Sequence, residues 1–187
     1  MLDLLIIGAG GFGRAVAEAV LLGGQHHLAG FVDDRWPDLE PIWDRPILGR
    51  LADLASLRDR AHGCVVAIGD NTARRSAFEA AVRAGFVPAS IVHPRAWVSP
   101  RARLANGALV MAGAIVGTEA SLEAGVIVNA AAVVDHHARV GAFAHLGVGA
   151  RMAGGAVLGA GAWIQEGCTV PPGQTVGPGA IVRRPGP

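Results

Sequence analysis

The chain contains no lysine and no tyrosine, and only two of its 187 residues are cysteine. Cys64 and Cys168 are too few for the disulfide framework of a small secreted domain. A net charge of +1 gives no reason to expect binding to nucleic acid or to an anionic membrane. All sixteen basic residues are arginine, which we attribute to genomic composition and not to function.

Long apolar segments are also missing. The chain has no apolar run long enough for a bilayer, so we expect no membrane span. The first residues include Asp3 and lack the basic stretch of a secretory signal, which predicts a cytoplasmic protein. We predict no bound metal. Cys64 begins an apparent strand and Cys168 falls in the repeat described next, so we expect both to be buried thiols.

A repeat of six residues occupies the second half of the chain. From residue 96 to residue 180, one residue in each repeat is alanine except at Val126, Cys168 and Gln174. Four places before each of these positions the residue is aliphatic. This aliphatic series comprises Val92, Val98, Leu104, Val110, Val116, Leu122, Val128, Val134, Val140, Leu146, Met152, Leu158, Ile164, Val170, Val176 and Val182. One large and one small inward residue in every six is typical of a hexapeptide-repeat parallel β-helix.

Such a repeat builds a triangular prism. A period of six does not match an α-helical face, where apolar residues recur after three and four positions. Each six-residue unit instead forms one short strand and one corner, and three such units complete a coil. Successive coils stack about 4.8 Å apart, and each is stabilised by its neighbours. Residues 92–182 therefore provide five coils. The alternative is a prism that serves only as a rigid spacer or trimerisation rod.

The first ninety or so residues alternate between strand and helix patterns. We expect strands at residues 4–7, 28–32 and 64–68, and helices at residues 15–22, 51–60 and 72–84. This alternation indicates a parallel sheet with helices on its faces, which is an α/β, Rossmann-like domain. We therefore predict a Rossmann-like domain at residues 1–88 and a β-helix domain at residues 89–187.

A glycine-rich turn follows the first predicted strand. Gly8, Gly10 and Gly13 form a Gly-x-Gly-x-x-Gly motif, and Asp33 follows at the end of the second predicted strand. The glycines allow a phosphate to approach the helix N-terminus closely, and an acid at this spacing can hold a ribose hydroxyl. A domain this short provides about half of a doubly wound fold, which suits one nucleotide better than a dinucleotide. Alternatively, Asp33 and Asp34 are only a solvated strand end.

Three of the seven histidines lie close together in the repeat. His136, His137 and His145 fall outside both inward columns, so we expect their side chains to point outward. A step of three repeats places Gly154 one coil above His136, and Trp163 one coil above His145. Histidine is the natural general base near neutral pH, and a backbone N–H near Gly154 could polarise a carbonyl group. One outward histidine would be surface decoration, whereas this grouping beneath glycines indicates a catalytic site.

These features together resemble a known family. Residues 133–145 (VVDHHARVGAFAH) are similar to the active-site stretch of the sialic-acid O-acetyltransferase type of sugar acetyltransferases, which includes the bacillosamine-pathway N-acetyltransferases. The segments 7–13 (IGAGGFG), 32–34 (VDD), 67–71 (AIGDN) and 91–94 (IVHP) match the same family in the same order. The hexapeptide columns are typical of the hexapeptide-repeat superfamily as a whole. The preceding nucleotide-binding type of domain and the pair Asp135-His136 restrict the resemblance to the sugar acetyltransferases named above.

The resemblance implies an acetyl-CoA-dependent acyltransferase with a left-handed β-helix. It implies a homotrimer with its active sites between neighbouring prisms. It also implies a nucleotide-linked amino sugar, or a sialic-acid-like sugar, as the acceptor in cell-surface glycan synthesis. By this resemblance the sugar nucleotide would contact Gly10, Gly11, Phe12, Asp33, Asp34 and Gly69.

The resemblance also implies roles at the catalytic end. His136 would be the general base that deprotonates the sugar amine or hydroxyl, with His137 beside it in the catalytic set. The N–H near Gly154 would hold the developing oxyanion, and His145 would lie against the acetyl group. The CoA site would be lined by His145, Gly154, Glu166 and Arg184.

Two departures from the family's pattern concern this catalytic end. The family has Glu or Asp directly after the catalytic histidine, whereas this chain has His137. Either an acid from a neighbouring subunit takes over, or the base is weaker, or activity has been lost. The family also continues through a further partial coil and a tail that helps to cover CoA. This sequence stops at Pro187, which indicates truncation or looser CoA binding.

Two other functions compete with acetyl transfer. The replacement of the acid by His137 would suit a sugar-nucleotide-binding protein without transferase activity. The glycine-rich turn would suit a nicotinamide-dependent oxidoreductase, but the β-helix would then have no role. The sequence does not distinguish N-acetylation from O-acetylation, and it does not identify the sugar or the acyl group.

Overall fold

The computed structural model describes residues 1–183 of the chain. These residues form two compact units, of which the first comprises Met1–Ile91 and the second begins at Val92. The boundary that the sequence predicts, between residues 88 and 89, lies three residues earlier in the chain. Each unit is described by itself below.

The first unit contains a parallel sheet of four strands in the order β2-β1-β3-β4. The strands are Leu2–Ile7 (β1), His26–Val32 (β2), Gly63–Val66 (β3) and Val87–Pro88 (β4). The helices are Gly11–Gly23 (α1), a 3₁₀ helix at Leu51–Leu57 (η1), and Asn71–Arg83 (α2). Each strand and helix expected in this region is present. The third strand ends at Val66 and not at residue 68, and the segment expected to be a helix over residues 51–60 is a shorter 3₁₀ helix.

Strand β1 lies between β2 and β3, so both of its edges are paired. Leu4, Leu5 and Ile6 are completely buried. An uninterrupted apolar run of this kind is what a parallel strand needs when both of its faces are covered. The run positions the loops that follow the carboxyl ends of β1 and β2, where the candidate nucleotide-binding residues lie.

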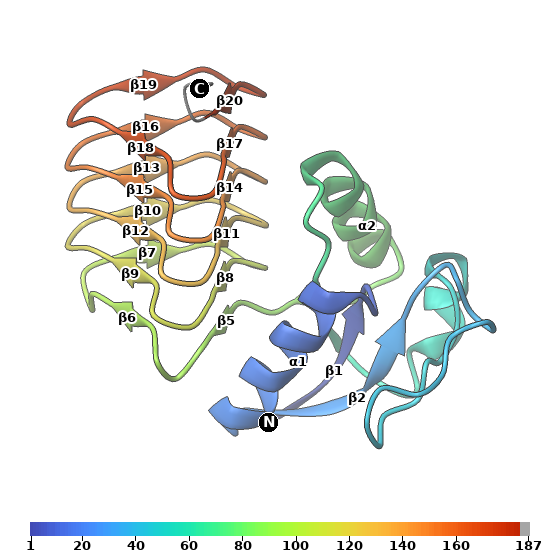
Figure 1. Ribbon diagram of the computed structural model, residues 1–187. Coiled ribbons are helices and arrows are strands. Elements are labelled where there is room, and N and C mark those ends of the chain that lie inside the picture. The colour runs from blue at the N-terminus through green and yellow to red at the C-terminus, as the bar shows by residue number, and fades with distance from the viewer. Residues whose placement is uncertain (184–187) are drawn as a thin grey trace. The chain divides into compact units, whose positions relative to one another are not determined.

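The second unit is a prism of three parallel sheets, visible as stacked coils in Figure 1. We call the sheet β20-β17-β14-β11-β8-β5 face 1, the sheet β18-β15-β12-β9-β6 face 2, and the sheet β19-β16-β13-β10-β7 face 3. Each strand has two residues. The strands are Ile91–Val92 (β5), Trp97–Val98 (β6), Arg103–Leu104 (β7), Leu109–Val110 (β8), Ile115–Val116 (β9), Ser121–Leu122 (β10), Ile127–Val128 (β11), Val133–Val134 (β12), Arg139–Val140 (β13), His145–Leu146 (β14), Arg151–Met152 (β15), Val157–Leu158 (β16), Trp163–Ile164 (β17), Thr169–Val170 (β18), Thr175–Val176 (β19) and Ile181–Val182 (β20).

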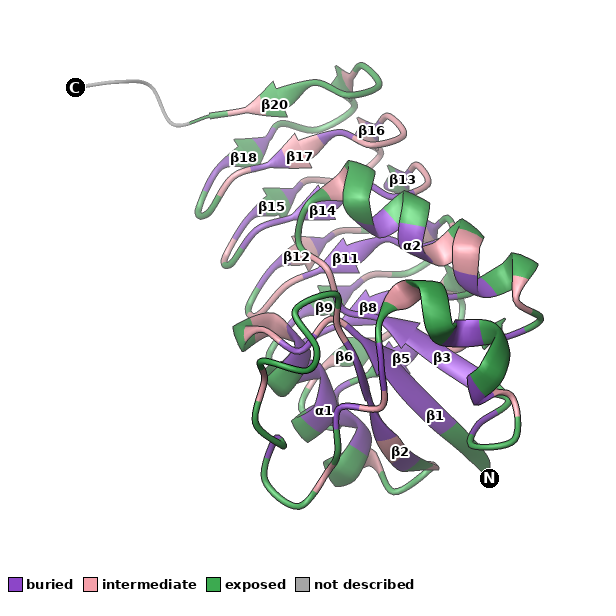
Figure 2. Ribbon diagram, turned by 90° about the vertical axis from the view of Figure 1, so that its right-hand side faces the viewer, coloured by how far each residue is buried: buried purple, intermediate pink, exposed green. Residues whose placement is uncertain are grey.

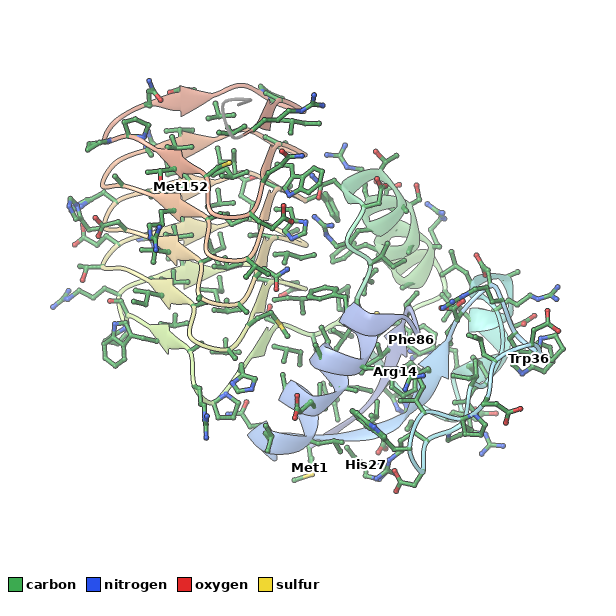
Figure 3. All side chains as sticks on the ribbon, viewed as in Figure 1. Met1, Arg14, His27, Trp36, Phe86 and Met152 are labelled. Atoms are coloured by element: carbon green, nitrogen blue, oxygen red, sulfur yellow. The ribbon has the colours of Figure 1, made fainter. Side chains whose placement is uncertain are left out.

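The register between coils is three repeats throughout, as predicted. Leu122 pairs with Val140, and Val140 pairs with Leu158. The aliphatic residue of each central strand points inward, and Met152, labelled in Figure 3, lies fully buried inside the prism. The alanine column packs beside it and is also buried through the central coils, which appear as purple segments in Figure 2. The two inward columns are therefore confirmed in the centre of the prism.

The columns are less buried at the two ends of the stack. Val92 in β5 is 40% exposed, and Gln174 and Ala180 are exposed. The prediction of a buried inward position is wrong at these residues. The reason is that a side chain in a coil is covered by the coils on either side, and β5 and β20 are the end strands of their sheet.

Both cysteines are free thiols and both are buried, as predicted. Burial raises the pKa of the Cys64 thiol to about 12, so this residue is an inert part of the core. Along residues 1–183, no helix combines the length and the apolar character that crossing a bilayer requires.

Candidate functional site

The candidate catalytic residues lie at one corner of the prism, between face 2 and face 3. This corner is formed by residues 117–120, 135–138 and 153–156 of successive coils, and we call it the histidine corner. His136 and His137 follow β12 and precede β13. Both side chains are well exposed, at 59% for His136 and 60% for His137, so the prediction that they point outward is confirmed.

His137 occupies a left-handed backbone position with a φ of 60°. One coil earlier, Glu119 has the same conformation with a φ of 59°, and one coil later the position is Gly155. A left-handed position favours glycine, and another residue there costs about 1–3 kcal/mol. Glu119 and His137 therefore occupy strained positions, stacked one coil apart.

The stacked side chains form a continuous polar network. His137 Nε2 lies 2.9 Å from Glu119 Oε2, and His137 Nδ1 lies 3.0 Å from His136 Nδ1. The two imidazole rings meet edge to face, with centroids 5.2 Å apart and an interplanar angle of 87°. Glu119 is thus connected to His136 through the ring of His137.

Asp135 has a different role from Glu119. Its Oδ1 accepts a hydrogen bond of 2.7 Å from the backbone N–H of His136, which closes the local turn. Its Oδ2 lies 3.9 Å from His136 Nε2, which is too far for a hydrogen bond. Asp135 therefore holds the backbone at this corner, and the imidazole of His136 is bonded through Nδ1 to His137.

Gly154 lies directly against the His136 ring, as the three-repeat spacing predicts. A Cβ atom at Gly154 would come within 2.5 Å of His136 Nε2, so only glycine leaves room for the ring in this position. The N–H of Gly155 donates to the His136 carbonyl over 2.9 Å, which fixes the two coils together. Within residues 1–183, no hydrogen bond uses the N–H of Gly154. This donor is therefore available near His136 Nε2.

The remaining predicted residues of the catalytic end lie elsewhere on the prism. His145 belongs to β14 on face 1 and stacks on Trp163 with centroids 6.0 Å apart. It lies outside the buried interior columns, as predicted, yet it is only 9% exposed, and the indole of Trp163 stacks on its ring. Glu166 is exposed at the corner between faces 1 and 2, beside Gly147. Arg184 lies outside the described residues.

The glycine-rich turn of the first unit divides into packing positions and open positions. Gly8 has a φ of 106°, and a Cβ there would lie 2.8 Å from the Ala67 carbonyl oxygen. A Cβ at Gly13 would collide with the carbonyl oxygen of Gly8, so this glycine is needed where α1 meets β1. Gly10, Gly11 and Gly69 have nothing within 4 Å of a built Cβ. The three glycines expected to contact a ligand therefore all border open space.

The predicted acids line a hollow at the ends of β1 and β2. The hollow has a volume of about 170 Å³ and is lined by Ile7, Gly8, Val32, Asp33, Asp34, Leu51 and Ile68. Asp34 is exposed and accepts a hydrogen bond of 2.8 Å from the N–H of Leu51. Phe12 is partly buried at the start of α1. The structure thus brings Asp33 and Asp34 to the rim of one small cavity.

Asp33 is held by bonds within the unit. Its Oδ2 accepts from the N–H of Ala9 at 2.8 Å and from Arg35 Nη2 at 2.9 Å, while its Oδ1 accepts from Arg35 Nε at 2.8 Å. The hydrogen bonds from the Arg35 side chain, helped by those from the backbone N–H groups of Ala9 and Arg35, lower the pKa of Asp33 to about 2. Arg35, two residues after Asp33, is a partner that the motif spacing did not predict.

We expect the Asp33 bonds to make the stability of the chain depend on pH. Because the pKa of Asp33 is lower in the folded chain than its ordinary value of 3.8, its contribution is complete above about pH 4 and is lost as the pH falls towards 2. Exposure of Arg35 to solvent limits this contribution to about 1–2 kcal/mol. Urea unfolding of the native chain and of Asp33→Asn should differ by this amount at pH 6 and converge near pH 2. A constant difference at both pH values would contradict the assignment.

Sequence reasoning missed Glu119 and a set of arginines beside it. A hollow of about 630 Å³ on the side of face 3 is lined by Pro100, Arg101, Arg103, Glu119, Ser121, His137 and Arg139. A step of three repeats back from His137 would have led to Glu119, because this step relates every stacked pair in the prism. The arginines carry no comparable signal in the sequence, since arginine is the chain's only strongly basic residue type.

Comparison with protein families and solved structures gives consistent matches. Residues 3–81 match the family model of the PglD N-terminal domain. The acetyltransferase domain of PglB from Neisseria gonorrhoeae, solved with acetyl coenzyme A, is 37% identical and superposes with a TM-score of 0.90. That match covers 96% of this chain and 86% of the PglB domain. Comparison with curated protein sequences gives no match.

A second similar structure is an enzyme from Caulobacter crescentus. It is GDP-perosamine N-acetyltransferase with one histidine replaced by alanine, solved with CoA and GDP-perosamine. It is 34% identical, has a TM-score of 0.80, and the match covers 98% of this chain and 91% of the enzyme. WeeI from Acinetobacter baumannii, at 18% identity and a TM-score of 0.60, shares the fold. The architecture is thus an α/β domain followed by a left-handed β-helix.

Proposed function

This chain belongs to the bacillosamine-type family of sugar N-acetyltransferases, and we propose on that premise that it transfers an acetyl group from acetyl-CoA to an amino group of a nucleotide-linked sugar. An acyltransferase of this type needs a base for the acceptor and a donor for the carbonyl oxygen of the thioester. We assign the reaction to the cytoplasm, as the sequence predicts, and to the synthesis of a cell-surface glycan.

One observation carries this proposal. The Nε2 of His136 lies beside Gly154, whose N–H makes no hydrogen bond within residues 1–183. A proton acceptor and a backbone donor are therefore adjacent at an exposed corner, as direct acyl transfer requires. Acetyl-CoA supplies the activated acetyl group when it is bound. His136 would take the proton of the attacking amine, and the N–H of Gly154 would stabilise the carbonyl oxygen as it gains negative charge.

The first unit is the proposed binding site for the sugar nucleotide. Gly10, Gly11 and Gly69 border open space, and Gly10 precedes the first residue of α1. The N-terminus of a helix favours phosphate through its free N–H groups, and open glycines let the phosphate approach. Asp34 at the rim of the hollow would accept from a ribose or sugar hydroxyl, because Arg35 and Ala9 already occupy Asp33.

The proposed active site needs residues from more than one chain. His136 and Gly154 lie at the histidine corner, whereas His145 lies on face 1 and Glu166 at another corner. If all of these residues contact acetyl-CoA, they must come from neighbouring prisms. We therefore propose a homotrimer in which the histidine corner of one chain meets face 1 of the next.

A chain that binds the sugar nucleotide without acetylating it is the second candidate. It is favoured by His137, which stands where the family has a carboxylate. The 2.9 Å contact between His137 and Glu119 weakens the case for this second candidate, because a carboxylate reaches the corner from the preceding coil.

An assay of CoA release distinguishes the two candidates. The protein is incubated with acetyl-CoA and a panel of UDP- and GDP-linked amino sugars, together with sialic-acid-type sugars. We expect thiol release that requires an amino sugar, and mass spectrometry of the product should show one added acetyl group on nitrogen. Acetylation of a hydroxyl would correct the acceptor atom. Binding of a nucleotide sugar by calorimetry, with no release for any acceptor, would replace the transferase by the binding-only candidate.

A further inference from the structure

We propose that Glu119 and His137 are positioning residues, and that Glu119 acts through His137 to hold His136 in the tautomer with its proton on Nδ1 and its lone pair on Nε2. The inference concerns this chain's own side chains. It rests on the proposed function only in the use of that lone pair as the general base. A carboxylate would thus serve His136 from one coil earlier in the same chain.

The tautomers follow from which groups can donate. An ionised carboxylate accepts hydrogen bonds and cannot donate them, so the 2.9 Å contact with Glu119 requires a proton on His137 Nε2. A neutral imidazole then has its lone pair on Nδ1. The 3.0 Å contact between the two Nδ1 atoms needs one proton, which must therefore be on His136. The Nε2 of His136 is left as an acceptor beside Gly154.

The same network would stabilise His136 after it accepts a proton. The attacking amine forms the new carbon–nitrogen bond and gives its proton to His136 Nε2, and the carbon–sulfur bond then breaks. The departing thiolate takes that proton from Nε2, so His136 returns to its starting state. While His136 is positively charged, the ring of His137 connects it by hydrogen bonds to the negative charge of Glu119, which stabilises the imidazolium.

Fold stability does not account for this arrangement. Both residues adopt left-handed backbone conformations at a position where the column continues with Gly155 and Gly173. The contact between their side chains is more than half exposed, and such exposed polar pairs add little to stability. The left-handed conformation instead stacks the side chains of Glu119 and His137 in adjacent coils. The backbone N–H of His137 donates to the Thr118 carbonyl at 2.9 Å and joins the two coils at this point.

Among the described residues, the arginines near Glu119 do not bind its carboxylate, which contacts His137 instead. Arg101, Arg103 and Arg139 line the hollow beside Glu119. Within residues 1–183, the Glu119 carboxylate contacts the His137 ring and forms no salt bridge with any of these arginines. The Glu119 carboxylate is therefore directed at the imidazole of His137, although three arginine side chains line the same hollow.

Nuclear magnetic resonance of histidine-labelled protein tests the tautomers without any substrate. Long-range correlations from ring carbons to ¹⁵N should show a proton on Nδ1 of His136 and on Nε2 of His137. In Glu119→Gln the preference of His136 for Nδ1–H should be lost, because the amide can donate as well as accept. Glu123→Gln is the matched control, since Glu123 is an exposed acid bonded to the N–H of Ala142 at the next corner. Native spectra with the proton on His136 Nε2, or identical spectra for the native chain and Glu119→Gln, would overturn the proposal.

Kinetics then connect the tautomer to the reaction. We expect Glu119→Gln to lower kcat about 10–100-fold with little change in KM or Tm, a smaller loss than the roughly 10⁴-fold effect of a buried triad carboxylate because this pair is exposed. The double variant Glu119→Ala/His137→Glu places a carboxylate directly beside His136. It should recover most of the activity that the single variant Glu119→Ala loses relative to the native chain. His137→Gly should lower kcat while leaving Tm equal or higher, because glycine suits the left-handed position.

An unchanged kcat in Glu119→Gln would overturn the catalytic part of the proposal. A native chain without transferase activity would count against the proposed function alone, since the spectra still decide the tautomers.

Discussion

Replacing His136 by alanine is expected to lower the rate of acetyl transfer about 10²–10⁴-fold, which is the usual contribution of a general base. The imidazole Nε2 is the proposed proton acceptor beside Gly154, and alanine provides no substitute. The loss should appear in kcat measured by CoA release with the best amino-sugar acceptor. The Tm should be unchanged, because the side chain is 59% exposed and is not part of the hydrophobic core of the prism.

The control for this variant is His27→Ala. His27 is an exposed histidine in β2 that pairs with Asp3, and it has no part in the proposed chemistry. Its removal should leave kcat and KM unchanged. If His136→Ala retained native kcat on every active acceptor, His136 would not be the base.

Replacing Gly154 by alanine should have the second largest effect, because the added Cβ would come within 2.5 Å of His136 Nε2. Gly154 does not have a positive φ, so alanine fits the backbone there and the imidazole must move instead. A displacement of about 1 Å at a reacting group can reduce the rate about 100-fold. We expect that loss in kcat together with an unchanged Tm.

Gly177→Ala is the matched control for Gly154→Ala. Gly177 also lies in the β-helix, has no positive φ, and has nothing within 4 Å of a built Cβ. This variant should retain native kcat. The structure of Gly154→Ala should show a rotated His136 ring; native activity in that variant, or an unmoved ring, would argue against the proposed contact.

The sequence was informative wherever the six-residue period alone decides the position of a residue. The six-residue spacing predicted the strands, the three-repeat register of Leu122 with Val140, and the place of Gly154 above His136. These follow from periodicity, because a coil that stacks on its neighbours must repeat its inward residues. The same regularity would have found Glu119 had it been applied downward from His137.

The sequence was uninformative where contacts depend on side-chain placement in space. His145 lies outside the inward columns, as the spacing predicts, yet its ring is nearly buried against Trp163, since the spacing gives the strand position but not what covers the ring. Asp33 matches the position of a ribose-binding acid, yet its oxygens are taken by Ala9 and Arg35. Such choices between partners depend on the conformation of neighbouring loops.

The sequence by itself determined the architecture, because a strict period of six leaves a stacked prism as the way to bury its aliphatic residues. It also determined that His136, His137 and Gly154 share one corner. The tertiary structure decided which groups those residues contact. The left-handed conformations at residues 119 and 137 turn both side chains to the same side of the corner, so a carboxylate, two imidazoles and a glycine N–H come together there. Spacing fixes which residues are stacked, whereas backbone dihedral angles and ring orientations fix which atoms meet.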